Sequence, residues 1–336
     1  MSERQNTRVL VNKRPVGLPK PDDFRLDTVP VSSPADDEML LKTIWLSLDP
    51  YMRGRMNDET SYGKPITGGV VSQVVESNIA AFETGDFVTG IYGWQQYAIA
   101  RPGDVRFFKI DPSLAPLSTA IGAAGMPGQT AYYGLLKVGK PKPGETVVVS
   151  AASGAVGSVV GQIAKFEGCR AVGVAGGEAK CRHVVEDLGF DACVDYKAGS
   201  LDAELAAACP DGIDVYFENV GGDVLLAVSK LLNEGARVPI CGYISAYNAT
   251  SQDEVTPPAE ILDALDSHPL HRFFGVTEWL DEFEESARYL GGLIRDGKLK
   301  YRETVVEGIE NAPAAFLMLF SGQNLGKLLI KVAEPQ

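Results

Sequence analysis

The chain has 336 residues, of which 45% are hydrophobic and 22% are charged. This length predicts about two domains, and this composition is typical of a soluble globular protein. A formal net charge of −13 argues against electrostatic attraction to nucleic acid or to an anionic membrane. We interpret the acidity as a contribution to solubility.

The N-terminal residues MSERQNTRVLVNKRPVG do not resemble an export signal, because charged side chains interrupt every apolar stretch. No apolar run in the sequence is long enough to cross a bilayer. The cysteines are odd in number and lack a disulfide-like spacing: Cys169, Cys181, Cys193, Cys209 and Cys241. We therefore expect a reduced, cytoplasmic protein without a membrane or nucleic-acid partner.

The first third of the chain contains short β-prone segments separated by Pro, Gly and Asp. Strands are predicted at MLLKTIWLSL (Met39–Leu48), GGVVSQVVES (Gly68–Ser77) and DFVTGIYG (Asp86–Gly93). Alternating β-branched residues with turn residues at this spacing predict a small, irregular, barrel-like β domain.

From Met126 onward, strand-like and helix-like segments alternate. Strands are predicted at residues 146–152, 170–177, 191–196, 213–222 and 236–244, and helices at 154–168, 178–189, 223–232 and 282–297. This alternation predicts a doubly wound parallel sheet. Short strands return in YRETVVEG and GKLLIKV near the C-terminus. The predicted α/β architecture is a Rossmann domain, residues 126–300, inserted in a split β domain formed by residues 1–125 and 301–336.

The stretch VVVSAASGAVGSVVGQIAK, residues 147–165, contains the spacing Ala152-x-Gly154-x-x-Gly157 of a dinucleotide fingerprint. It follows a predicted strand and opens a predicted helix, which is the context that gives the motif its meaning. Gly154 would let the backbone approach a pyrophosphate, while Gly157 and Gly161 would let the helix pack against the sheet. The helix N-terminus adds N–H groups and partial positive charge. The alternative is an ordinary strand-to-helix turn made of small residues.

The second predicted strand ends in Gly176-Gly177, where an NAD site usually has an acidic residue that binds the adenosine ribose. The glycines leave room for a 2′-phosphate. Lys180 in the next turn and Tyr196 at the end of the third strand are its candidate partners. Glu178 supports the alternative, an NAD-type ribose contact. We expect a preference for NADPH.

Three other chemistries are rejected. Tyr133 and Lys137 have the spacing of a short-chain dehydrogenase pair, but they lie upstream of the glycine turn. The segment from Gly322 to Lys327 is one residue too short for a phosphate-binding P-loop. The chain has no Cys before Cys169 and no His before His183, so the first domain lacks these zinc ligands. His268 and His271 lie in a predicted loop, and four-ligand zinc spacing appears nowhere. We expect a metal-free mechanism.

The motifs together resemble the medium-chain dehydrogenase/reductase superfamily. The closest resemblance is to its zinc-independent double-bond reductases of the prostaglandin reductase and curcumin reductase type. The resemblance extends over nearly the whole chain and is carried by LSLDPYMRGRM, GMPGQTAYYGLL, AASGAVGSVVGQIAK, VAGGEAKCRHV, DVYFENVGG, CGYISAYNAT, ENAPAAF and GQNLGKLLIKV. It implies a GroES-like first domain. Residues 61–75 are several positions shorter than the family pattern, in a segment that borders the substrate cleft of relatives.

The resemblance implies NADPH-dependent reduction of the carbon–carbon double bond of an α,β-unsaturated ketone or aldehyde. It assigns cofactor contacts to residues of several loops, and pocket positions to Tyr51 and Tyr247. The implied cofactor contacts are Gly154, Ala155, Val156, Gly157, Lys180, Tyr196, Asn219, Cys241, Gly242, Tyr243, Ile244, Ser245, Tyr247, Phe274, Gly275, Val276 and Asn324.

Hydride transfer to the β carbon of a conjugated carbonyl builds negative charge on its oxygen, and hydrogen-bond donors must stabilise that charge. Candidate donors are the Tyr247 hydroxyl and the ribose 2′-hydroxyl of the cofactor, and Tyr51 could hold the carbonyl or deliver a proton. The structural alternatives are a steric wall for Tyr247, domain packing for Tyr51 and a helix cap for Asn219.

Two rival functions remain open at this point. One is an NADPH:quinone oxidoreductase of the same superfamily, and the other is a catalytically silent NADPH-binding protein. Relatives are commonly dimers, so a homodimer is expected, with VVVS and VPICGYI as candidate strands for pairing between subunits.

Overall fold

The computed structural model describes residues 4–104 and 107–336, and the chain divides into two compact units. The first unit consists of the chain up to Gly122 together with Glu303–Asn324 and Leu328–Gln336. The second unit consists of Ala123–Arg302 and Leu325–Lys327. The second unit is therefore inserted into the first along the sequence, and a short piece of the C-terminal segment returns to it.

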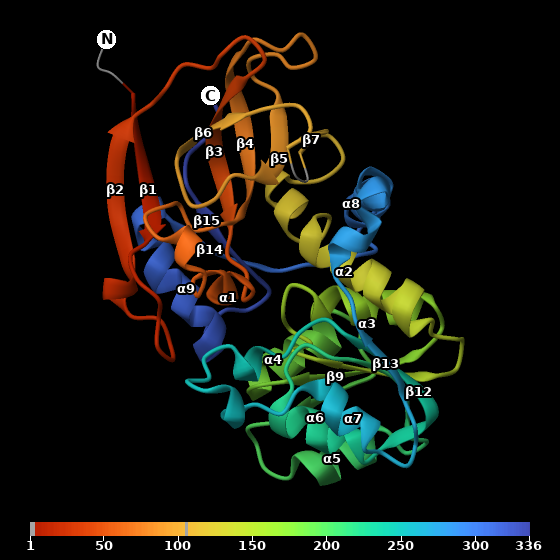
Figure 1. Ribbon diagram of the computed structural model, residues 1–336. Coiled ribbons are helices and arrows are strands. Elements are labelled where there is room, and N and C mark those ends of the chain that lie inside the picture. The colour runs from red at the N-terminus through yellow and green to blue at the C-terminus, as the bar shows by residue number, and fades with distance from the viewer. Residues whose placement is uncertain (1–3, 105–106) are drawn as a thin grey trace. The chain divides into compact units, whose positions relative to one another are not determined.

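The first unit contains a largely antiparallel sheet with the strand order β14-β15-β3-β4-β5-β7, and β6 also pairs with β3 (Figure 1). A separate ribbon pairs β1 (Gln5–Val11) with β2 (Phe24–Pro30). The sheet strands are β3 (Met39–Ser47), β4 (Gly69–Ser77), β5 (Phe87–Ile91), β6 (Tyr97–Ala100), β7 (Phe108–Ile110), β14 (Glu303–Glu307) and β15 (Lys327–Lys331), and the helices are α1 (Met52–Arg55) and α9 (Ala312–Ser321). The three strands predicted in the first third of the chain are confirmed as β3, β4 and β5.

The second unit contains a parallel sheet with the strand order β10-β9-β8-β11-β12-β13. This is the order 3-2-1-4-5-6 of a Rossmann fold, so the predicted fold class is confirmed. The strands are β8 (Thr146–Ser150), β9 (Arg170–Ala175), β10 (Ala192–Asp195), β11 (Ile213–Phe217), β12 (Leu232–Ile240) and β13 (Leu270–Phe273). The helices are α2 (Met126–Tyr133), α3 (Gly157–Phe166), α4 (Glu178–Arg182), α5 (Leu201–Ala208), α6 (Gly222–Ser229), α7 (Pro258–Asp263) and α8 (Phe283–Arg295).

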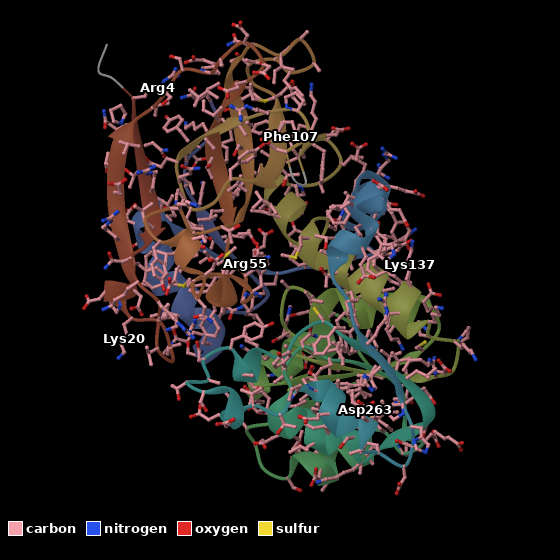
Figure 2. The ribbon with its side chains drawn as sticks, viewed as in Figure 1. Arg4, Lys20, Arg55, Phe107, Lys137 and Asp263 are labelled. Carbon is pink, nitrogen blue, oxygen red and sulfur yellow. The ribbon has the colours of Figure 1, made fainter. Side chains whose placement is uncertain are left out.

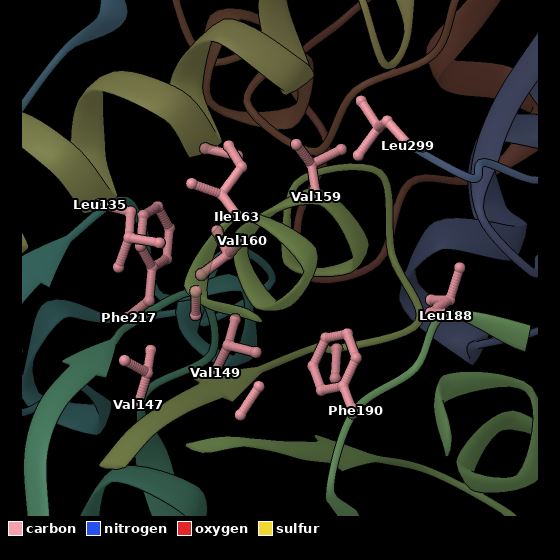
Figure 3. Packing of buried hydrophobic residues seen from close by; sticks show 14 of the residues in the cluster. Leu135, Val147, Val149, Val159, Val160, Ile163, Leu188, Phe190, Phe217 and Leu299 are labelled. Carbon is pink, nitrogen blue, oxygen red and sulfur yellow. The ribbon is translucent and has the colours of Figure 1, made fainter. Parts of the chain in front are cut away.

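Both faces of the parallel sheet are covered, because successive side chains of a strand point to opposite sides. Val147 and Val149 of β8 pack on one face with residues of α2, α3 and α8, while Val148 packs on the other face with residues of α5, α6 and α7. Figure 3 shows the first of these clusters, in which Val159, Val160 and Ile163 of α3 lie among the buried side chains. A strand buried on both faces explains why VVVS contains no polar–apolar alternation.

Gly161 on α3 has a different packing partner from the one expected. A Cβ atom on Gly161 would lie 1.8 Å from Cζ of Phe190, which precedes β10. Glycine at this position therefore makes room for an aromatic ring rather than for the strands themselves. Phe190 is buried and belongs to the cluster in Figure 3.

Several predicted element bounds were wrong. The helix predicted over residues 178–189 is interrupted, because α4 ends at Arg182 and a wider π-type turn covers His183–Asp187. The helix predicted to reach Leu232 ends at Ser229, and β12 already begins at Leu232. The predicted loop around His268 and His271 contains β13, which includes His271. His271 Nε2 lies 2.9 Å from a carboxylate oxygen of Asp263, which Figure 2 labels on α7.

The strands VVVS and VPICGYI do not have a free edge. β8 pairs with β9 and β11, and β12 pairs with β11 and β13. A strand with a neighbour on each side has no backbone groups left to pair with a second subunit. The expectation that these two strands pair across subunits is therefore wrong. Among the described residues, no helix is long and apolar enough to cross a membrane.

Candidate active site

The residues of the second unit that are predicted to contact the cofactor lie at the carboxyl ends of the strands of the parallel sheet. The glycine turn follows β8, Gly176–Lys180 follows β9, Tyr196 follows β10, Asn219 follows β11, the 241–247 loop follows β12, and Phe274–Val276 follows β13. Ligands of doubly wound sheets bind at the carboxyl ends of the strands, where the strand order reverses. Here that reversal lies between β8 and β11.

The glycine turn runs from Ser150 to the start of α3 at Gly157. Ala151 has a φ of 52°, a left-handed conformation that is uncommon for a residue with a side chain. A Cβ on Gly157 would lie 2.4 Å from the carbonyl oxygen of Ala151, so this close passage of helix and turn requires glycine. A Cβ on Gly154 would meet only Ala151 within 4 Å. The backbone at Gly154 can therefore be approached closely by a ligand, and Ala155 and Val156 complete the turn.

The segment Gly322–Lys327, rejected above as a P-loop, contains glycines for backbone reasons. Gly322 ends α9 with a φ of 67°. Gly326 has a φ of 72°, and its N–H donates a hydrogen bond of 3.0 Å to the carbonyl of Ser153 in the glycine turn. A Cβ on Gly326 would lie 1.9 Å from the carbonyl oxygen of Arg302. Backbone of the C-terminal segment therefore packs directly on the glycine turn within the second unit.

The turn after β9 is held by the end of β10. The N–H of Gly177, whose φ is 104°, donates a 2.7 Å hydrogen bond to Asp195. The side chain of Tyr196 lies against Gly176, where a Cβ would come within 2.7 Å of the Tyr196 hydroxyl oxygen. These contacts bring the backbone of Gly176–Gly177 and the Tyr196 ring together.

Two lysines lie close to this turn. Lys180 is half-buried, and burial lowers its pKa, with a further contribution from the nearby positive charge of Lys197. The ammonium of Lys197 lies 5.8 Å from the centre of the Tyr196 ring. Glu178, the residue that favoured NAD, instead pairs with Arg182 one helical turn later. The sequence reasoning missed Lys197, although its position directly after Tyr196 at a strand's carboxyl end was a signal.

The end of β11 is organised by a buried carboxylate that the sequence reasoning also missed. Glu218 is fully buried, and its Oε1 accepts hydrogen bonds from Ser150, Tyr216 and the backbone N–H groups of Val220 and Gly221 at 2.6–3.1 Å. Burial raises the pKa of Glu218, whereas the two backbone N–H groups act in the opposite direction. Its other oxygen, Oε2, has no hydrogen-bond partner among the described residues.

Asn219 is fixed by Ser150 rather than by a helix. Its N–H donates to the Ser150 hydroxyl at 2.8 Å, and its side-chain amide donates to the Ser150 carbonyl at 2.8 Å. The N-cap residue of α6 is Gly221, and the Asn219 amide donates to the Ser150 carbonyl and not to the backbone of α6. The alternative that Asn219 caps the adjacent helix is therefore wrong.

The loop after β12 is tied to the same region. The N–H groups of Cys241 and Gly242 both donate to the carbonyl of Glu218, and those of Ile244 and Ser245 donate to Asn219 and Val220. A Cβ on Gly221 would lie 2.9 Å from Cβ of Tyr243, so the two loops are in direct contact. The β11 and β12 ends thus form one hydrogen-bonded unit.

Tyr247 lies at the end of this loop with its hydroxyl against Gly242, where a Cβ would be 2.6 Å from the hydroxyl oxygen. Its ring is 6.1 Å from that of Tyr243. Burial, followed by the neighbouring Cys241 and Tyr243, raises the pKa of Tyr247 to about 12. The hydroxyl therefore keeps its proton at neutral pH and can donate a hydrogen bond.

The segment after β13 is positioned by packing. Phe274 is buried with its ring 5.9 Å from that of Phe217, and its N–H donates to the carbonyl of Ile240. The N–H of Gly275 donates to Glu278 at 2.8 Å, and Val276 begins a short helical turn. The Phe274 side chain is thus part of the core, so the backbone of this segment is what remains for a ligand.

Tyr51 and Asn324 belong to the first unit. Tyr51 directly precedes α1, and its partly buried ring packs against the core cluster of that unit. This packing agrees with the structural alternative for Tyr51. The predicted catalytic role of Tyr51 and the predicted cofactor contact of Asn324 stay predictions.

Tyr133 and Lys137, the pair rejected above as a short-chain dehydrogenase motif, have a structural role. The Tyr133 hydroxyl donates to the carbonyl of Glu282 at 2.9 Å, and Lys137, labelled in Figure 2, pairs with the Glu282 carboxylate at 2.5 Å. The three histidines do not form a ligand set, and the described part of the chain contains no group of three His, Cys, Asp or Glu side chains that could hold a metal ion.

Two family models match the chain. Residues 7–108 match the N-terminal domain of oxidoreductases, and residues 155–271 match a domain described as zinc-binding dehydrogenase. Together with the sheet orders, these matches define a medium-chain dehydrogenase/reductase.

Relatives that match nearly the whole chain identify its group within this superfamily. The chain is 46% identical to the NADPH-dependent curcumin reductase of Escherichia coli, with 98% of both chains covered, and 41% identical to prostaglandin reductase 1 of Sus scrofa, with 96% and 97% covered. It is 40% identical to an NADP-dependent 2-alkenal reductase of Nicotiana tabacum over 99% of both chains. The chain belongs to the zinc-independent double-bond reductases of the medium-chain dehydrogenase/reductase superfamily.

Solved structures agree with this assignment. CurA of Vibrio vulnificus, solved in complex with NADPH, is 46% identical and superimposes with a TM-score of 0.89 over 98% of this chain and all of the CurA chain. Escherichia coli quinone oxidoreductase, also solved with NADPH, has a TM-score of 0.80 at 19% identity, covering 97% of this chain and 99% of that one. The second likeness shows the fold alone.

Proposed function

We propose that the chain catalyses NADPH-dependent reduction of the carbon–carbon double bond of α,β-unsaturated ketones and aldehydes. The observation that carries this proposal is the full-length identity of 46% to an NADPH-dependent curcumin reductase. The relatives named as prostaglandin and 2-alkenal reductases support the same reaction class. Quinone oxidoreductase is the weaker candidate, since the named structure of that activity is only 19% identical.

The residues at the sheet edge fit NADPH. The glycine turn at Gly154, where a Cβ would meet only Ala151, and the N-terminus of α3 suit a pyrophosphate. Lys180 and Lys197 are two neighbouring cations, an arrangement that a 2′-phosphate dianion would stabilise. We propose contacts from Tyr196, Asn219, Asn324, residues 241–247 and residues 274–276 as well. The cofactor supplies the hydride that reaches the β carbon of the substrate.

Tyr247 is the proposed donor to the carbonyl oxygen of the substrate. Its raised pKa keeps the hydroxyl protonated, and a donor already held in position stabilises the negative charge that develops on the oxygen. Tyr51 is proposed to hold the carbonyl or deliver the proton to the α carbon. We propose that the domain of residues 126–300 binds the cofactor and that the domain of residues 1–125 and 301–336 binds the substrate.

The chain is further proposed to be a cytoplasmic homodimer. Its five cysteines are free thiols, which fits a reducing compartment. The end strand β13 has one unpaired edge in its sheet and exposes Leu270 and Phe273, with 68% and 46% of their surfaces accessible. An edge strand with exposed apolar side chains suits pairing with a second copy.

Consumption of NADPH with an enal, an enone, a curcumin-like diketone and a simple quinone tests the proposed activity. We expect turnover with the conjugated carbonyls and a product whose carbon–carbon bond is saturated while the carbonyl is retained. Faster turnover with the quinone than with every enone would favour the quinone reductase. Tight NADPH binding without turnover of any enone would favour a silent binding protein.

A further inference from the structure

Two of the five cysteines, Cys181 and Cys193, have their sulfur atoms in direct contact. Cys181 is on α4 and Cys193 is on β10, and their Sγ atoms are 2.9 Å apart. Both side chains are partly exposed, unlike Cys169 and Cys209, which are buried. A disulfide bond needs the two sulfurs at about 2.05 Å. A small approach of α4 and β10 would therefore bring this pair to bonding distance.

Gly173 of the neighbouring strand β9 lies beside the Cys193 sulfur. Cys193 pairs in register with Gly173 of β9, and a Cβ on Gly173 would lie 3.4 Å from the Cys193 sulfur. The same Cβ would lie 2.6 Å from Cβ of Ala152, so glycine is required at this position.

The two thiols differ in acidity. Burial raises the pKa of Cys193, and its contact with Cys181 and the charge of Asp195 raise it further. Burial also raises the pKa of Cys181, but the hydrogen bond from Cys193 acts in the opposite direction. Asp195 and Glu204 add smaller contributions that raise it. Cys181 is thus the sulfur that ionises first and reacts first, because the thiolate is the nucleophile.

We propose that Cys181 and Cys193 form a modification site that a low-molecular-weight disulfide, such as oxidised glutathione, converts to an intramolecular disulfide. The Cys181 thiolate attacks one sulfur of the oxidant, and the first glutathione leaves as a thiolate. Cys193 then loses its proton and attacks the Cys181 sulfur, and the second glutathione leaves. Two protein thiols are oxidised, one external disulfide is reduced to two thiols, and the reaction reverses with excess glutathione.

The site is joined to the proposed NADPH contacts, so this part of the inference rests on the proposed function. Lys180 directly precedes Cys181, and Tyr196 follows Cys193 by three positions. Closing the bond draws α4 toward β10 and shifts the lysine that would hold the 2′-phosphate. We expect oxidation to raise the dissociation constant of NADPH about three- to tenfold, a partial loss of one charge-assisted hydrogen bond.

The site is tested on the full-length protein with oxidised glutathione at about pH 8.5, near the ordinary cysteine pKa. We expect the thiol count to fall from five to three, the mass to fall by two hydrogen atoms, and peptide mapping to link Cys181 to Cys193. The Cys181→Ser and Cys193→Ser variants should each fail to form the internal bond, whereas Cys209→Ala should form it normally. Retention of five thiols, adducts of glutathione alone, or a bond between other cysteines would overturn the site.

The coupling is tested by the binding of NADPH to reduced and oxidised protein, measured by fluorescence without substrate. A higher dissociation constant in the oxidised wild type, absent from both serine variants and reversed by a reductant, is the expected result. Equal constants for the two forms would overturn the coupling. Both measurements are independent of turnover, so they remain decisive even if the proposed enone reduction fails.

Discussion

The Ser150 hydroxyl donates a 3.1 Å hydrogen bond to the buried carboxylate of Glu218, which joins the carboxyl end of β8 to that of β11. These are the two strands between which the strand order reverses. The same hydroxyl accepts the N–H of Asn219, and the Glu218 carbonyl accepts two N–H groups of the next loop. One pair of side chains thus aligns the glycine turn, Asn219 and the 241–247 loop.

Glu218 gives a prediction about pH. Because burial raises its pKa in the folded state, the protonated acid contributes stability that is present below the unfolded pKa of about 4.3 and is lost as pH rises through the folded pKa. Glu218→Gln keeps a neutral acceptor oxygen and lacks this titration. Urea unfolding should therefore show the variant gaining stability relative to the wild type as the pH rises above about 4.3, the unfolded pKa. A constant difference over this range would show that Glu218 has no raised pKa.

Lys180→Ala should reduce the preference for NADPH over NADH. A charge-assisted hydrogen bond contributes about 1.5–3 kcal/mol, which corresponds to roughly ten- to hundredfold in affinity. Dissociation constants for both cofactors measure this ratio, and Lys298→Ala, an exposed lysine after α8, is the control. If the parent ratio persists in Lys180→Ala, the 2′-phosphate assignment is incorrect.

Tyr247→Phe should lower kcat by about two orders of magnitude if the hydroxyl is the main donor to the carbonyl oxygen. Tyr289→Phe, on the outer side of α8, should leave kcat unchanged. The measurement is steady-state turnover with saturating NADPH and enone. A loss below about threefold would assign the oxyanion to the ribose hydroxyl or to water.

Two glycine substitutions should change the free energy of unfolding in opposite directions. Gly157→Ala places a Cβ 2.4 Å from a backbone carbonyl, so we expect it to destabilise the protein by about 1–3 kcal/mol and weaken NADPH binding. Gly292→Ala, within α8, meets no atom within 4 Å, so we expect stabilisation of up to about 1 kcal/mol. Denaturant unfolding of both variants checks these signs, and a neutral Gly157→Ala would contradict the close passage at the glycine turn.

The sequence predicted the parts of the fold that local patterns specify. The strand–turn–helix around Gly154 and Gly157 was predictable because glycine spacing and apolar periodicity coincide there. Strand β13 was not predicted, since LHRF has polar residues and a single edge partner, so burial does not impose a pattern. The break after Arg182 was not predicted either, because the π-type turn His183–Asp187 contains no helix-breaking residue.

The side-chain network of the site was less predictable. In the sequence, Glu218 was noted only as part of DVYFENVGG, and its carboxylate accepts a hydrogen bond from Ser150, almost seventy positions away. The contact between Cys181 and Cys193 joins helix α4 to strand β10. Such relationships between distant residues leave no local periodicity in one sequence.

The hydrogen bond from Gly326 to Ser153 limits how the protein can be dissected. A recombinant fragment of residues 123–302 would contain every strand of the parallel sheet but would leave the Ser153 carbonyl without this backbone donor. Such a truncated protein should bind dinucleotide more weakly than the intact polypeptide. Evolutionary exchange of this nucleotide module between proteins would likewise have to carry along a tripeptide encoded far downstream.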